Sequence, residues 1–203
     1  MNNSEANFKK LLTQYDYVLP DELIAQSPAT PRDAARLMIY DRATDRVITD
    51  TFLNLPQYLP KDSVLVFNKT RVIPARLFVH KESGGHVELL YLRAVGGVFE
   101  MLANRKLSVG MRLLLTVKKI FIVQACGAEG IYTIKPEFDI INVNNFFIMH
   151  GHTPIPPYIK HATHSEMQLR RAYQTVFARQ FGSVAAPTAS LHFTRRLMKK
   201  IHD

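Results

Sequence analysis

The 203-residue chain carries 26 Lys and Arg against 17 Asp and Glu, a formal charge of +9, and 47% of its residues are hydrophobic. This apolar content excludes global disorder, and the length suits one large domain or two small ones. The positive charge favours a polyanionic partner such as nucleic acid, although a generally basic surface would give the same total.

The single cysteine, Cys126, excludes an intrachain disulfide and a metal cage built from cysteines, so a reducing, cytoplasmic setting is expected. No apolar run approaches the roughly 18 residues that a membrane span requires, and the polar first residues lack a signal-peptide pattern. We therefore expect a protein without a membrane segment and without a metal.

Helices and a hairpin are expected first along the chain. Ser4 is suited to cap a helix, and Pro20 stands where a second helix would begin, with Pro28 ending it. Residues 36–40 and 47–52 predict a hairpin, after which Asn54 is suited to cap a short turn. The apolar residues 63–67 predict a strand that is buried on both faces.

Polar groups surround this first part of the predicted sheet. Arg32 and Arg36 flank Asp33, an arrangement that can orient a carboxylate or hold an anion. The strand at 63–67 leads into the polar run Asn68-Lys69-Thr70-Arg71. Side chains at a strand end are a common place for chemistry in α/β folds.

Residues 72–134 change character, because short strand-like runs alternate there with glycine-bearing turns. This spacing predicts a small antiparallel barrel or sandwich. We expect it to be a domain of residues 72–135, inserted into a larger domain formed by 1–71 and 136–203. Its basic side chains could follow a phosphate backbone or form a scattered solvated surface: Lys81, Arg93, Arg105, Lys106, Arg112, Lys118 and Lys119.

Helical patterns return after Pro136. Asp139 is a plausible cap for a helix that Gly151 ends, and Ser165 with Gln168 has capping-box spacing for a helix with an apolar face through Phe177. Between these helices, the proline-rich residues 154–160 predict a stiff, extended segment.

The run from Gly182 to Thr194 is the strongest candidate for chemistry. Residues 183–186 predict a buried strand that must stop at Pro187. Thr188, Ser190 and His192 then follow within five residues, although a lone histidine is more often structural than catalytic. Thr194 should cap a last helix. Arg195 and Arg196 in its first turn oppose the helix dipole, which a nearby phosphate or carboxylate would offset.

Several of these runs resemble one family. Residues 185–194 are similar to the Ala-Ala-Pro-Thr-Ala-Gly-Leu-His-Phe-Thr run of the S-adenosylmethionine:tRNA ribosyltransferase-isomerases, with Ser190 in place of Gly. Residues 68–77 resemble the family's Asn-Asp-Thr-Arg-Val-Ile-Pro-Ala-Arg-Leu, with Lys69 in place of Asp. Residues 15–28, 154–159 and 173–178 resemble further motifs, and Ala35 stands where the family has Ser.

The resemblance implies an α/β fold: an incomplete α/β barrel-like domain, truncated at its C-terminus, with an inserted antiparallel β-barrel. It implies transfer and isomerisation of the ribosyl group of S-adenosylmethionine to 7-aminomethyl-7-deazaguanine in tRNA, which gives epoxyqueuosine. S-adenosylmethionine is then the ribosyl donor and tRNA the partner. The family is monomeric, and an exposed sheet edge would favour a dimer.

The resemblance also implies roles for residues. The catalytic set is His192, Thr188 and Arg71, with His192 as the first candidate for proton transfer and Arg71 for holding the carboxylate of the donor. The residues expected to bind the donor are Asn68, Thr70, Arg71, Ser183, Thr188 and Ser190.

A catalytically inactive relative that binds RNA or another partner is the alternative. Lys69, Ala35 and the missing C-terminal part favour the alternative, whereas the intact residues 188–194 favour the enzyme.

Overall fold

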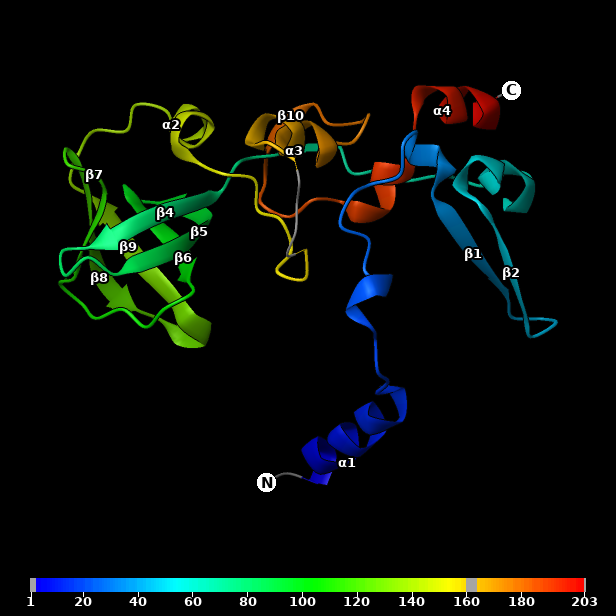
Figure 1. Ribbon diagram of the computed structural model, residues 1–203, viewed down its shortest axis with the longest axis horizontal. Coiled ribbons are helices and arrows are strands. Elements are labelled where there is room, and N and C mark those ends of the chain that lie inside the picture. Colours follow the sequence, from blue (N-terminus) through cyan, green and yellow to red (C-terminus); the bar gives the residue numbers. More distant parts are fainter. Residues whose placement is uncertain (1–2, 160–163, 203) are drawn as a thin grey trace. The chain divides into compact units, whose positions relative to one another are not determined.

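The computed structural model describes residues 3–159 and 164–202 (Figure 1). The α-helices are α1 Asn3–Leu12, α2 Val143–His150, α3 Glu166–Ala172 and α4 Arg195–His202. The strands outside the barrel are β1 Arg36–Asp41, β2 Arg46–Thr51, β3 Thr70–Val72 and β10 Gln180–Ser183. The chain divides into two units, Met1–Ser27 with Pro156–Thr163 and Pro28–Ile155 with His164–Asp203. The first contains α1, and the second contains the barrel, the other helices and the candidate site.

Six antiparallel strands form a closed barrel in the order β4-β5-β6-β9-β8-β7, drawn in green in Figure 1. Their bounds are β4 Arg76–Lys81, β5 His86–Val95, β6 Val98–Ala103, β7 Arg112–Thr116, β8 Lys119–Cys126 and β9 Ile131–Pro136. Along β5, for example, the buried side chains of Val87, Leu89 and Tyr91 alternate with side chains that point outward. The antiparallel barrel and the mixed α/β class predicted from the sequence are confirmed.

Helix α2 adds Phe146 and Phe147 to the hydrophobic core of the barrel. The Asn142 side chain accepts a hydrogen bond from the Asn145 backbone N–H at 3.0 Å, so Asn142 caps this helix and not Asp139 as predicted. The helix ends at Gly151, as expected. There the chain passes so close to Pro74 that a Cβ atom on Gly151 would stand 1.7 Å from the Pro74 carbonyl oxygen.

A second core lies beside α4. Phe52, Phe193 and Leu197 are buried in it, and the Phe67 ring stacks on the Phe177 ring with centroids 4.1 Å apart. The predicted hairpin is confirmed as β1 paired with β2. After it comes the 3₁₀ segment Phe52–Tyr58, in which Asn54 donates to the Asp50 carboxylate and does not cap the turn.

One carboxylate is fully buried at the edge of this second core. Asp33 accepts two hydrogen bonds from the Arg196 guanidinium, both at 2.6 Å, and one from the Thr194 hydroxyl at 2.6 Å. Arg32 and Arg36 are therefore not its partners. Because Asp33 lies next to the first turn of α4, it offsets the unfavourable position of Arg196 in that turn.

The prediction of a strand at residues 63–67 is wrong. Val64 and Val66 are 86% and 91% exposed, and no strand among the described residues pairs with this segment. Leu65 and Phe67 are half-buried. The alternation that marks an extended chain is present, but without a neighbouring strand the backbone forms no ladder.

Three other predicted elements are shorter or shifted. The helix predicted from Pro20 is only a 3₁₀ turn, Asp21–Leu23. The predicted capping box is confirmed at Ser165, but α3 ends at Ala172 because the Arg32 guanidinium takes up the carbonyl groups at that end. The prediction of a buried strand at 183–186 is wrong: β10 covers Gln180–Ser183, shares only Ser183 with the predicted range, and is mostly exposed because only β3 pairs with it among the described strands.

Gly151→Ala should lower the free energy of unfolding by about 1–3 kcal/mol, because the added methyl group forces the backbone away from Pro74. Urea denaturation followed by circular dichroism measures this change. Gly85→Ala is the matched control, since its Cβ would meet only Lys81 Cδ at 3.7 Å, an ordinary contact. Equal stability of the two variants would contradict the close approach at Gly151.

Arg196→Gln should lower the free energy of unfolding by about 1–3 kcal/mol at neutral pH, because the buried Asp33 carboxylate loses its charged partner. Hydrogen bonds from Arg196, above all, hold the pKa of Asp33 below its ordinary 3.8, against the opposing effect of burial. The stabilisation is therefore complete above pH 3.8 and disappears as the pH falls through the lower folded-state pKa.

The difference between wild type and the Arg196→Gln variant should accordingly shrink in acid, when urea denaturation is repeated across this range. The adjacent Arg195→Gln serves as the control and should stay within about 0.5 kcal/mol of wild type. A pH-independent difference would show that Asp33 is not the group responsible.

Candidate functional site

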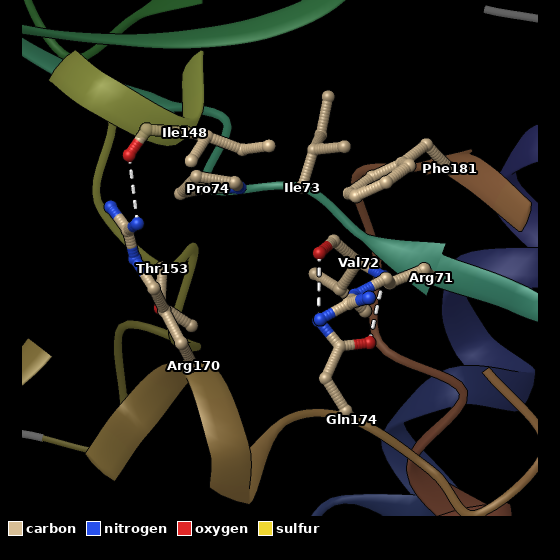
Figure 2. Close-up of a pocket in the computed structure, with 9 residues that line it drawn as sticks. All are labelled: Arg71, Val72, Ile73, Pro74, Ile148, Thr153, Arg170, Gln174 and Phe181. Atoms are coloured by element: carbon tan, nitrogen blue, oxygen red, sulfur yellow. Dashed lines mark hydrogen bonds between the residues drawn. The ribbon is translucent and has the colours of Figure 1, made fainter. Parts of the chain in front are cut away.

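Arg71, on β3, lies where two cavities meet. The smaller cavity has a volume of about 140 Å³ and is bounded by β3 and the residues after it, the end of α2, α3 and Phe181 of β10 (Figure 2). The Arg71 guanidinium lies over the Phe181 ring, 5.1 Å from its centroid. This contact orients an exposed cation at the mouth of a mostly apolar pocket.

Gln174 forms one wall of the smaller cavity. Its side-chain Oε1 accepts from the Val72 N–H at 3.0 Å, and its Nε2 donates to the Val72 carbonyl at 2.7 Å (Figure 2). The amide thus pairs with β3 as a neighbouring strand would. The sequence pattern places Gln174 off the apolar face of the predicted helix, where it could point to a site, and in the structure it lines this cavity.

Arg170 forms the opposite wall, and its guanidinium is held by hydrogen bonds within the protein. Its guanidinium donates to the Ile148 carbonyl at 2.8 Å, the Gly151 carbonyl at 2.6 Å and the Glu166 carboxylate at 2.8 Å. Glu166 also accepts from the Thr153 N–H and hydroxyl, both at 2.9 Å. These contacts fix α3 against the end of α2.

The larger cavity is a cleft of about 510 Å³ that shares Arg71, Arg170 and Gln174 with the smaller one. Arg32, Arg171 and Arg195 also line it, together with the buried Thr175 and with Val176, Phe193 and Thr194. None of the described residues that line this cleft has a carboxylate side chain. Arg171 was not predicted to line a site, because the pattern indicated one continuous helix through Phe177. Arg195 was singled out only for opposing the dipole of the last helix, which a nearby phosphate or carboxylate would offset.

The polar turn before Arg71 is internally organised. The Asn68 Oδ1 accepts hydrogen bonds from both the N–H and the hydroxyl of Thr70. Lys69 is exposed, and its carbonyl accepts from the Arg179 and Gln180 N–H groups at 2.9 and 3.2 Å. The side chain of Lys69 thus stands in solvent, while its backbone joins β10.

Ser183 lies at the end of β10, beside β3. Its hydroxyl donates to the Ala185 carbonyl at 2.6 Å, and its carbonyl accepts from the Ile73 N–H at 2.9 Å. Ser183 is therefore close in the fold to the residues that follow Arg71, as a shared site requires.

Thr188, Ser190 and His192 lie on the 3₁₀ segment Thr188–His192. The half-buried His192 ring packs against Phe52 with centroids 5.1 Å apart. None of these three residues lines either cavity that contains Arg71, whereas the next residues, Phe193 and Thr194, line the cleft. The described structure thus places His192 beside the cleft and not within it.

Potential metal ligands do not gather in the described part of the chain. Residues 3–159 and 164–202 hold no group of three or more His, Cys, Asp or Glu that could bind a metal ion. No helix in these ranges is both long and apolar enough to cross a membrane.

Comparison of the sequence with known proteins shows the family to which the chain belongs. A family model described as "Queuosine biosynthesis protein" matches residues 12–203. The curated relatives include S-adenosylmethionine:tRNA ribosyltransferase-isomerases from Sulfurimonas denitrificans, 38% identical, and Syntrophomonas wolfei, 43% identical. A third such relative, from Rubrobacter xylanophilus, is 42% identical. Each alignment covers 94% of this chain and 57%, 54% and 55% of the respective relative.

Among solved structures, the crystal structure of an S-adenosylmethionine tRNA ribosyltransferase from Thermotoga maritima is 27% identical, with a TM-score of 0.34. The match covers 92% of this chain and 53% of that one. The chain therefore spans about half the length of the relatives that it matches. Given the family model that covers it from residue 12 to residue 203, the chain belongs to the queuosine biosynthesis protein family.

Proposed function

We propose that this chain takes part in the transfer and isomerisation of the ribosyl group of S-adenosylmethionine to 7-aminomethyl-7-deazaguanine in tRNA, giving epoxyqueuosine. The observation that carries the proposal is identity of 38–43% to ribosyltransferase-isomerases over 94% of the chain. Because the chain spans about half of those relatives, the activity is proposed for it in combination with the portion that they carry in addition. S-adenosylmethionine and tRNA are then its substrates, and the cytoplasm its compartment.

The proposed reaction needs proton transfer at two places. The sulfonium acidifies the ribose 5′ carbon, so a base must remove a proton there, and adenine needs a proton as it leaves. An imidazole can serve in either role near neutral pH. His192 remains the candidate, because it immediately precedes two residues that line the cleft and its ring is held in place by Phe52.

Arg71 is proposed to hold the carboxylate of the donor's methionine part. Its guanidinium is exposed at the junction of the two cavities, and stacking on Phe181 leaves its N–H groups free to form a bidentate pair. The smaller cavity beside it, about 140 Å³ and largely apolar, offers room for an uncharged part of the same molecule.

The hydroxyl-bearing residues are proposed to position the ribose. Asn68 keeps its side-chain N–H groups available because its oxygen serves Thr70, and Ser183 keeps its lone pairs available because its hydroxyl donates to Ala185. Thr188 and Ser190 would add further hydroxyls from the neighbouring 3₁₀ segment.

Adenine release tests the function directly. The chain, alone and co-expressed with the remaining portion of the Syntrophomonas wolfei relative, is incubated with labelled S-adenosylmethionine and tRNA that carries the precursor base. We expect release of labelled adenine from the combination. Binding of tRNA without any release would instead indicate an inactive RNA-binding relative.

His192→Ala should lower the rate of adenine release in the active combination by at least about 100-fold, the lower end of the usual effect of losing a general acid or base. His86→Ala is the matched control, because His86 lies on the barrel, where its ring packs against the His80 ring. Full activity of the His192→Ala variant would show that His192 takes no part in proton transfer.

Arg71→Gln should raise the KM for S-adenosylmethionine by about tenfold to a hundredfold, because the variant cannot form a charged hydrogen bond to the carboxylate. The kcat should change less, since the carboxylate takes no part in bond breaking. Arg93→Gln on the barrel, where Arg93 pairs with Glu100, is the control. An unchanged KM would assign the carboxylate to another residue.

A further inference from the structure

The cleft is lined by more arginines than have hydrogen-bond or ion-pair partners among the described residues. Of its five arginines, Arg32 donates to three carbonyl groups around the end of α3, and Arg170 is engaged by Glu166 and two carbonyls. The guanidinium groups of Arg171 and Arg195, by contrast, have no hydrogen-bond or ion-pair partner within the part of the chain that the structure describes. Both side chains are exposed.

The two unpartnered arginines sit on fixed backbone. Arg171 is in the last turn of α3, and Arg195 is the first residue of α4. The cleft is also lined by Gln174, Thr175 and Thr194, none of which carries a negative charge. Like charges held together in this way repel one another unless an anion binds between them.

The size of the cleft argues for an extended anion. Its volume of about 510 Å³ is within the usual range for sites that take a molecule much larger than a single carboxylate. Planar guanidinium groups match the geometry of phosphate oxygens, which they bind in pairs of parallel hydrogen bonds.

Two arginines of the barrel are less suited to this role. Arg93 pairs with Glu100 at 2.7 Å, and Arg112 contacts Glu82 at 3.1 Å and Glu137 at 3.3 Å. These carboxylates neutralise much of the local charge, so a phosphate chain gains less there than in the cleft.

We propose that this cleft binds the phosphodiester backbone of RNA, with Arg171 and Arg195 each contacting a phosphate and Arg71 at the inner end toward the smaller cavity. The choice of RNA as the anion rests on the proposed function, whereas the site itself rests on the unpartnered arginines. RNA bound here would pass the mouth of the pocket that Arg71 and Phe181 share.

Salt-dependent RNA binding tests the proposal. Binding of a fluorescently labelled RNA stem-loop to the 203-residue chain is followed by anisotropy at increasing NaCl concentration. The logarithm of the association constant falls linearly with the logarithm of the salt concentration. In the double variant Arg171→Gln/Arg195→Gln the magnitude of this slope should be smaller by about 2, one for each phosphate that the variant no longer neutralises. Arg171→Lys/Arg195→Lys should keep most of the slope, because the charge is retained.

The matched control is Lys106→Gln/Lys118→Gln, which removes two exposed cations from the barrel and should leave the slope nearly unchanged. Urea denaturation verifies that each variant is folded. Equal reductions of the slope in the cleft and barrel variants would show diffuse binding and overturn the proposal, as would a wild-type slope in the cleft variant.

This test is separable from that of the proposed function, because binding is measured without adenine release. RNA binding that depends on the cleft, without release by the combination, would refute the enzymatic function and leave the site standing. Adenine release with unchanged RNA binding in the Arg171→Gln/Arg195→Gln variant would refute this site alone.

Discussion

The guanidinium of Arg32 is the contact on which the arrangement of the site depends. It donates to the carbonyl oxygens of Arg171, Ala172 and Gln174 at 2.8, 3.0 and 2.6 Å. These carbonyls lie at and just beyond the end of α3, where a helix leaves acceptors without partners. The helix stops there, and Gln174 is free to turn its amide toward Val72. Residues 32, 72 and 174 are thereby joined although they are far apart in the chain.

Arg32 begins the 3₁₀ turn Arg32–Ala34, and Asp33, the next residue, links this turn to another helix. Arg32 reaches the end of α3 while Asp33 accepts from Thr194 and Arg196 at the start of α4. One short turn thus positions both helix ends that carry the unpartnered arginines of the cleft. The burial of the Asp33 carboxylate is tolerated because both of its oxygens accept hydrogen bonds, and removing one partner would leave a costly charge in the interior.

The sequence predicted those parts of the fold that local patterns determine. Alternating residues and glycine turns in 72–134 indicated the barrel, and the spacing of Ser165 and Gln168 indicated the start of α3. Failures occurred where distant residues decide the outcome. The end of α3 depends on Arg32, some 140 positions earlier, and the apolar residues 63–67 form no strand because nothing described pairs with them. In the candidate site, motif similarity pointed to Arg71 and the helix dipole pointed to Arg195, whereas Arg171 lines the same cleft only through tertiary structure.

Closure of the barrel has a consequence for how local stability is distributed in the chain. Each of its strands has a neighbour on both sides, and its interior holds large, fully buried side chains such as Phe121 and Leu77. Among the described residues, the sheets β1-β2 and β3-β10 have two strands each, so every one of these strands has a partner strand on one side only. Amide protons should therefore exchange with solvent slowly in the barrel and quickly around β3 and β10. The residues that carry the proposed chemistry would then belong to the part of the molecule that opens first.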